Sequence, residues 1–261
     1  MLSLLLAFTI FYSCNPAEEK KDSGVQPAMP AAEKKLRDAM AQYPDSLLLR
    51  ENLIQYFRDN SNYEMALAET DVYLKKDSNN PRFWDIRANL SIENEDTLQA
   101  IRSFEKAIEL YPDPGYIMSL GAIYAQTKNP MALAMADALM QATKAKAGKE
   151  ALFIKGLYYN YTGDKTKAIS FFDQCLALDY TYMFAYREKG IALYETGQYQ
   201  KAVDVLTRAV TLQNNYDEGY YWLGRSFEKL NRKADAIEAY KTALLYSPDY
   251  MEAQDALSKL K

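Results

Sequence analysis

The side chains that most often carry out chemistry in proteins are scarce in this sequence. Its 261 residues include no histidine and two cysteines, Cys14 and Cys175. Without histidine there is no Ser-His-Asp or Cys-His catalytic set, and the commonest metal ligand is missing as well. The glycines do not form a phosphate-binding loop. We therefore expect no catalytic residue, no cofactor and no metal site, and hence a protein that is not an enzyme.

The charged residues are mixed in sign along the whole chain. Thirty-one Lys and Arg stand against 35 Asp and Glu, which gives a net charge of −4, and no basic block occurs. Binding to nucleic acid depends on clustered Lys and Arg that neutralise phosphates. We therefore expect no nucleic-acid partner.

An apolar run, residues 2–12, precedes Cys14. As a helix it would span about 17 Å, against the roughly 30 Å of a bilayer core, so it is too short to cross a membrane but suits a signal peptide. Phe11-Tyr12-Ser13-Cys14 resembles the lipobox of bacterial lipoproteins. The resemblance implies that residues 1–13 are a signal peptide and that Cys14 becomes the acylated, palmitate-carrying first residue. The alternative is a fortuitous apolar N-terminus with a structural cysteine.

Residues 14–30 follow as an expected tether. From residue 15 onward the segment has no apolar periodicity and contains three prolines and a glycine, which argues against a helix. As a flexible coil it would reach about 20–25 Å and hold a folded body clear of a lipid surface. Its acidic pair Glu18-Glu19 is similar to the surface-export signal of some Bacteroidetes lipoproteins.

Beyond the tether the sequence repeats every 34 residues. Alanines recur at this spacing from Ala32 to Ala236 without a gap. A fixed period of this length indicates a stack of repeated supersecondary units. Residues 31–43 match only the second half of a unit, six full units follow, and residues 251–261 match only the first half.

The last full unit, residues 217–250, closely resembles the tetratricopeptide repeat. The family's large and small residues are matched at Tyr220, Leu223, Gly224, Phe227, Ala236, Tyr240, Ala243 and Pro248. The resemblance implies an all-α fold over residues 31–261, a right-handed superhelical solenoid of antiparallel helix pairs. Its six full repeats would follow an N-terminal half repeat and precede a C-terminal capping helix. Small residues at repeat positions 8, 20 and 27 let the helices cross closely. Cys175 occupies position 27 of its unit, which predicts a buried structural thiol.

The unit at residues 114–148 departs most from the pattern. Gly121 lies one residue early relative to Ala134, so we predict one extra residue in the loop at residues 127–129. The second helix of this unit would carry the small Ala138 where its neighbours carry a large residue. We expect thin packing there, and this unit is where we would place any hinge of the array.

In the family that the chain resembles, the first helix of each pair lines the concave surface of the solenoid. When the family's lining positions are transferred to this sequence, they predict mixed polar residues in the first two units and an apolar, aromatic strip in the middle units. A contiguous apolar strip typically marks an interaction site, unless the chain itself fills it. Asp85 and Glu150 stand where cations would help to bind an acidic C-terminal tail, which disfavours such a ligand. The predicted partner groove comprises Met118, Phe153, Leu157, Tyr161, Phe184, Arg187, Ile191, Tyr194, Tyr221 and Arg225.

These expectations combine into one functional hypothesis. The chain would be a non-catalytic protein-interaction scaffold that binds a partner peptide or helix in the groove. It would be attached to the outer membrane through the lipid alone, facing the periplasm or, alternatively, the cell surface. By analogy with tetratricopeptide lipoproteins it would serve envelope or pilus assembly. Two alternatives stay open: a soluble cytoplasmic adaptor, and a substrate-delivering accessory subunit of an envelope enzyme.

Overall fold

A computed structural model describes residues 29–142 and 148–260, and within these ranges the chain forms 14 α-helices and no strand. Six antiparallel helix pairs follow the single helix α1 (Ala31–Gln42) and precede the single helix α14 (Met251–Leu260). The predicted all-α solenoid, with its leading half repeat and its capping helix, is confirmed. The pairs are α2 (Leu47–Asp59) with α3 (Tyr63–Lys76), α4 (Pro81–Glu93) with α5 (Thr97–Leu110), α6 (Pro114–Gln126) with α7 (Met131–Ala142), α8 (Gly148–Thr162) with α9 (Lys165–Leu178), α10 (Met183–Glu195) with α11 (Tyr199–Leu212), and α12 (Asp217–Lys229) with α13 (Lys233–Tyr246).

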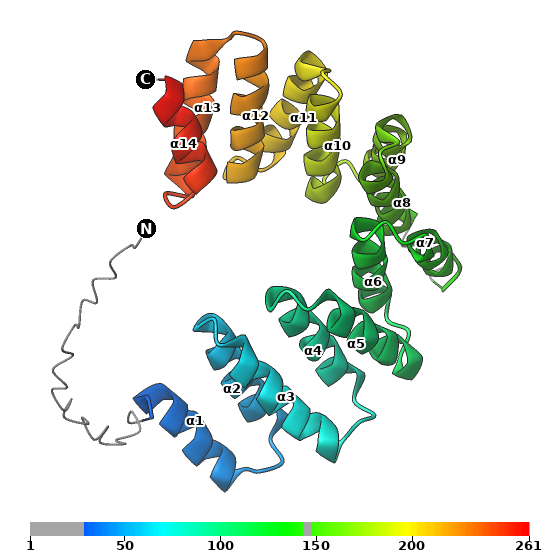
Figure 1. The fold of residues 1–261 in the computed structure, drawn as a ribbon, viewed down its shortest axis with the longest axis vertical. Helices are drawn as coiled ribbons and strands as arrows, with labels where there is room; N and C mark the ends of the chain where they lie inside the picture. The colour runs from blue at the N-terminus through cyan, green and yellow to red at the C-terminus, as the bar shows by residue number, and fades with distance from the viewer. Residues whose placement is uncertain (1–28, 143–147, 261) are drawn as a thin grey trace, which may run out of the picture.

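The pairs stack into a curved arc (Figure 1). Each helix packs on the next one along the chain. First helices of successive pairs are also in contact, for example α6 with α8 and α10 with α12. Contact between successive first helices places them on the inner side of the curve, where Figure 1 shows α2, α4 and α6. Because a single pair cannot bury its apolar face, the stacking of neighbours stabilises the whole array.

A residue in the left-handed backbone region closes the turn inside every pair. These residues have φ between +55° and +98° and lie seven residues after repeat position 8 in all six pairs. Side-chain caps then start several of the second helices, as where the Asp164 carboxylate accepts the backbone N–H of Lys167 at 3.1 Å. The turn residues are Ser61, Glu95, Lys128, Gly163, Gly197 and Asn231.

Close helix crossings explain the glycines at repeat position 8. A Cβ added to Gly156 would lie 2.4 Å from Cε1 of Phe172, and one added to Gly224 would lie 2.5 Å from Cε1 of Tyr240. Both aromatic rings are fully buried. Phe172 and Tyr240 stand at repeat position 24. In the first pair the large and small residues are interchanged, because the large Ile54 stands at position 8 and the smaller Thr70 at position 24. The two positions therefore share one volume.

The third pair differs from the others in the loop after its turn residue. Lys128, its turn residue, lies seven residues after Gly121 as in every other pair, so no extra residue precedes the turn. The additional residue follows the turn, because α7 begins three residues after Lys128, whereas the other second helices begin two residues after their turn residue. Ala134 is exposed, and its place in the 34-residue period is a coincidence. The early place of Gly121 arises before this pair, because the preceding unit, residues 81–113, is one residue shorter than the others.

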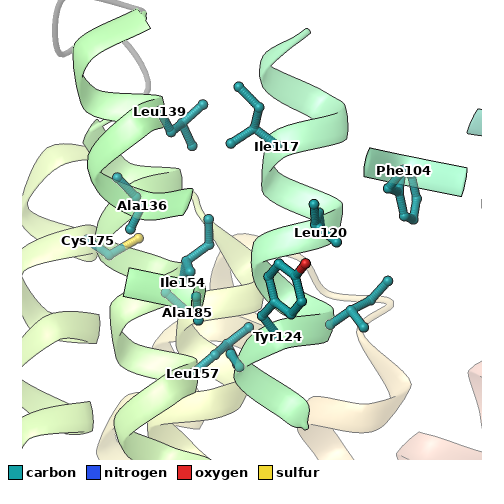
Figure 2. Packing of buried hydrophobic residues seen from close by; sticks show 14 of the residues in the cluster. Phe104, Ile117, Leu120, Tyr124, Ala136, Leu139, Ile154, Leu157, Cys175 and Ala185 are labelled. Atoms are coloured by element: carbon teal, nitrogen blue, oxygen red, sulfur yellow. The ribbon is translucent and has the colours of Figure 1, made fainter. Parts of the chain in front are cut away.

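Helix α7 buries Ala132, Ala136 and Leu139, which are 0% exposed. Ala136, rather than Ala138, therefore occupies the position that is large in the neighbouring pairs, and Ile154 of α8 fills part of that space (Figure 2). Cδ1 of Ile154 would lie 2.8 Å from a Cβ on Gly121. Because the buried side chains of α7 are small, α8 lies close to α6, and α6 packs on α8 as well as on α7.

Several predictions concern parts of the chain outside the described residues. They are the signal peptide at residues 1–13, the lipid attachment at Cys14 and all but the last two residues of the tether. Residues 143–147 of the proposed hinge also lie outside. Among the helices that are described, none combines the length and the hydrophobicity needed to cross a bilayer.

Candidate partner-binding surface

An apolar patch occupies the middle of the inner face. We call Met118, Phe153, Tyr182 and Phe184 the central cluster. The Phe153 ring lies 5.4 Å from that of Tyr182 and 6.2 Å from that of Phe184, centroid to centroid, and the Tyr182 and Phe184 rings are 5.7 Å apart. The Tyr182 hydroxyl lies 3.9 Å from Sδ of Met118. Three consecutive first helices, α6, α8 and α10, thus contribute to one patch.

Phe184 is the outermost member of this cluster. Its side chain is 61% exposed, whereas Met118, Phe153 and Tyr182 are half-buried. Burial raises the pKa of the Tyr182 hydroxyl, which stays neutral. An aromatic ring held by other rings and open to solvent is the type of side chain that forms an interface hot spot.

Tyr182 was missed by the sequence prediction because it lies just before α10 rather than within a first helix. The 34-residue period could have found it, since Tyr182, Tyr216 and Tyr250 share one place in successive units. Burial raises the pKa of the hydroxyl in all three.

The remaining apolar residues of the predicted groove divide into two groups. Tyr161 is 38% exposed, and Ile191 and Tyr194 are half-buried, so these three side chains are accessible to solvent. Leu157 and Tyr221 are only 4% and 8% exposed. Leu157 is therefore part of the core, and Tyr221 shows only a small part of its side chain, at the wall of a cavity beside α14. The expectation that these two residues lie open on the inner face is wrong.

The two arginines of the predicted groove are engaged within the chain. Nε of Arg187 donates to Glu218 at 2.6 Å, and Nη1 donates to Glu188 at 2.7 Å. Arg225 donates to the hydroxyls of Tyr221 at 2.8 Å and Tyr194 at 3.1 Å. Its guanidinium also lies 5.4–5.8 Å from the ring centroids of Tyr194, Tyr221 and Trp222. Both side chains stabilise the stack.

A buried polar pair near Arg187 was not anticipated. Glu188 and Asn160 are each 6% exposed, and Nδ2 of Asn160 donates to Glu188 at 3.3 Å. Burial raises the pKa of Glu188, while the neighbouring Arg187 opposes that shift. Nζ of Lys165 donates to Oδ1 of Asn160 at 2.7 Å and pairs with Glu195 at 2.5 Å. These contacts link the fourth and fifth pairs.

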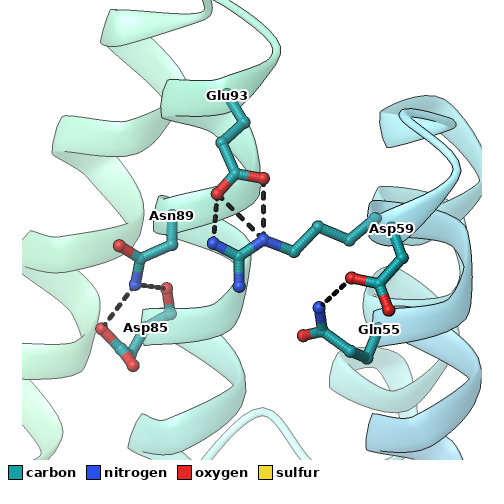
Figure 3. Close-up of polar contacts among 6 residues, drawn as sticks. Gln55, Asp59, Asp85, Asn89 and Glu93 are labelled. Atoms are coloured by element: carbon teal, nitrogen blue, oxygen red, sulfur yellow. Dashed lines mark hydrogen bonds and ion pairs between the residues drawn. The ribbon is translucent and has the colours of Figure 1, made fainter. Parts of the chain in front are cut away.

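Two arginines at the N-terminal end of the inner face are paired across helices. Arg58 of α2 pairs with Glu93 of α4 (Figure 3). Arg82 of α4 donates to both oxygens of Glu51 of α2, each at 2.6 Å. The charged groups of this end are therefore largely satisfied within the chain, while Leu48 of α2 and Ile92 of α4 are 67% and 44% exposed.

The side chain most able to act as a nucleophile is withdrawn from solvent. Cys175 is 0% exposed, and burial raises the pKa of its thiol to about 12. It packs among the apolar residues around Ile154 (Figure 2). The predicted structural role of this cysteine is confirmed. Within the described ranges, no three Cys, Asp or Glu residues are grouped so as to hold a metal ion.

Comparison with known families identifies the repeat. Two tetratricopeptide repeat models match the chain, one over residues 187–256 and the other over residues 81–114 and 149–182. Together the matches span more than half of the sequence. The chain therefore belongs to the tetratricopeptide repeat family.

Individual relatives are distant. The chain is 29% identical to tetratricopeptide repeat protein 28 of Mus musculus over 92 residues, and 28% identical to that of Homo sapiens. Each match covers 35% of this chain but only 4% of the relative. The chain thus corresponds to a small part of these curated relatives.

Two solved structures share the arrangement of the whole solenoid. A tetratricopeptide repeat protein from Parabacteroides merdae has a TM-score of 0.72 and 18% identity, covering 88% of this chain and 91% of that one. PilW, described as a widely conserved type IV pilus biogenesis factor, has a TM-score of 0.62 and 19% identity, with 80% and 97% coverage. At these identities the similarity establishes the fold alone.

Proposed function

We propose that this protein is a non-catalytic scaffold that binds a segment of a partner protein against the central cluster. The observation that carries the proposal is Phe184, a large aromatic side chain that is 61% exposed on the inner face beside three half-buried apolar neighbours. The nearby Arg187 is paired with Glu188 and Glu218, so apolar contact supplies most of the binding free energy.

Phe184→Glu is expected to weaken partner binding without unfolding the chain. Loss of an interface aromatic costs about 2 kcal/mol or more, or about thirtyfold in affinity. The test is a pull-down with the wild type and the variant, followed by titration of the recovered partner against each purified protein. Leu245→Glu is the matched control, because Leu245 is 73% exposed on the second helix α13. Equal affinity of wild type and Phe184→Glu for every recovered partner would refute the central cluster as the binding site.

We also propose that the scaffold is attached to the outer membrane through Cys14 and faces the periplasm. The apolar run at residues 2–12 and the lipobox-like Phe11-Tyr12-Ser13-Cys14 support this. Wild-type cells fed a labelled fatty acid should yield a labelled protein that partitions into detergent, and Cys14→Ser should abolish both. An unlabelled wild type would remove the anchor and favour the soluble cytoplasmic adaptor.

Envelope assembly, such as pilus biogenesis, is the process in which we place the scaffold. Support comes from the proposed anchor and from the fold shared with PilW, a type IV pilus biogenesis factor. Crosslinking in intact cells followed by mass spectrometry tests this, since the crosslinked partner should be an envelope-assembly component. An envelope enzyme as the partner would instead favour the role of accessory subunit.

A further inference from the structure

The cations of the inner face are already used by the chain. Each arginine there donates to a carboxylate or to tyrosine hydroxyls of a neighbouring helix, so none stands free to receive an acidic ligand. Arg225 is also enclosed by three aromatic rings. The contacts are Arg58 with Glu93, Arg82 with Glu51, Arg187 with Glu188 and Glu218, and Arg225 with Tyr194 and Tyr221.

Carboxylates remain on the C-terminal side of the central cluster. A cavity of about 310 Å³ between α12 and α14 is lined by Glu228, Glu252 and Asp255, with Tyr221 and Arg225 as its inner wall. Glu252 and Asp255 are exposed, and among the described residues neither has an ion-pair partner. Lys259 is the remaining cation in the lining. Negative charge is therefore in excess at this end.

Carboxylates also remain on the N-terminal side. Asp85 of α4 accepts a hydrogen bond from Nδ2 of Asn89 at 2.9 Å, and Asp113 accepts the backbone N–H of Gly115 at 2.7 Å as the cap of α6. Arg82 lies nearby but is bidentate to Glu51. Burial, together with the charge of Asp113, raises the pKa of Asp85. A cation placed here would relieve that repulsion.

From this arrangement we infer that the partner segment has an apolar centre with Lys or Arg on both sides. The apolar centre lies on the central cluster, and the basic flanks lie at Asp85 and Asp113 on one side and at Glu252 and Asp255 on the other. Two helix spacings separate α10 from α14, which is a distance of about 16–20 Å. About five or six residues of an extended peptide span this distance. The inference rests on the proposed function, because it assigns a chemistry to the occupant of the same surface.

Three labelled peptides test the inference by fluorescence polarisation with the full chain in detergent. They share a Leu-Trp-Leu centre and polar spacers of five residues, and they carry two Lys, two Ser or two Glu at both ends. We expect the Lys peptide to bind about tenfold more tightly than the Ser peptide at low salt, with the Glu peptide weakest. The difference should shrink to about twofold near 0.5 M salt, where the screening length falls to a few ångströms.

Charge reversal locates the effect on the protein. Glu252→Lys combined with Asp255→Lys should remove most of the preference for the Lys peptide. Glu64→Lys combined with Glu238→Lys is the control, because both residues are exposed on second helices and the net charge changes equally. A preference lost equally in both variants would show a nonspecific effect of net charge and overturn the inference.

The outcomes separate the inference from the proposed function. If the three peptides bind alike and Phe184→Glu weakens all of them, the binding surface stands and the basic flanks are wrong. If the Glu peptide binds most tightly, the basic flanks are wrong as well. If no peptide binds up to millimolar concentration, or if Phe184→Glu changes nothing, the binding surface itself fails and the inference fails with it.

Discussion

Phe172→Ala is expected to lower the free energy of unfolding by about 3–5 kcal/mol, as for other large-to-small aromatic truncations in protein cores. The Phe172 ring is 0% exposed and lies against Gly156 of the partner helix and Phe153 of the inner face. Loss of the Phe172 ring leaves a cavity where α8 crosses α9. Gly156, the facing residue of α8, has no side chain that could fill it. Denaturant unfolding followed by circular dichroism measures the change, and a loss below about 1 kcal/mol would contradict this close packing.

A size exchange at the same crossing tests whether the two positions share one volume. Gly156→Ile should destabilise the wild-type chain, since even a single added Cβ would lie 2.4 Å from the Phe172 ring. The double variant Gly156→Ile with Phe172→Thr copies the Ile54 and Thr70 arrangement of the first pair. The double variant should lose less free energy of unfolding than the sum of the losses of the two single variants. Gly156→Ile with Phe104→Thr is the control, and there the two effects should add because the sites lie in different pairs.

The fold was predictable because contacts in a solenoid are local. Each helix packs on its neighbours in sequence, so one 34-residue pattern specifies a unit and its interface together. Alanine spacing alone was insufficient in the third pair, where Ala134 keeps the period but is exposed. The distance from position 8 to the left-handed turn residue is the more reliable frame, because it is seven residues in all six pairs.

The candidate surface was predictable only in part. Repeat positions indicate which residues face inward, but they do not show how far a neighbouring helix covers them, and so Leu157 and Tyr221 were expected on the surface. The pairing of Arg187 was likewise missed, because its partner Glu218 lies on the next first helix. A spacing of 31 residues recurs in such pairs, including Glu51 with Arg82 and Tyr194 with Arg225. That spacing is a signal that sequence reasoning could use.

Cys175 should react with a thiol reagent at least about a thousandfold more slowly in the folded protein than in denaturant. Burial raises its pKa to about 12, so at pH 8 about one thiol in ten thousand is ionised, against about a quarter for an ordinary cysteine with pKa near 8.5. Steric protection slows the reaction further. Iodoacetamide labelling of the Cys14→Ser chain, read by mass spectrometry, isolates this thiol.

The same measurement reports the stability of the fourth pair, because Cys175 and Phe172 lie on one turn of α9. If labelling requires that α9 opens, its rate follows the population of the open form. Phe172→Ala should then accelerate labelling of Cys175 by about a hundredfold or more, in proportion to the free energy lost. Leu257→Ala is a matched core truncation in α14, five helices further along the stack. If the pairs open separately, Leu257→Ala should accelerate labelling far less than Phe172→Ala does. If the array opens as one body, the two variants should accelerate labelling equally. The comparison therefore measures how far along the stack cooperativity extends.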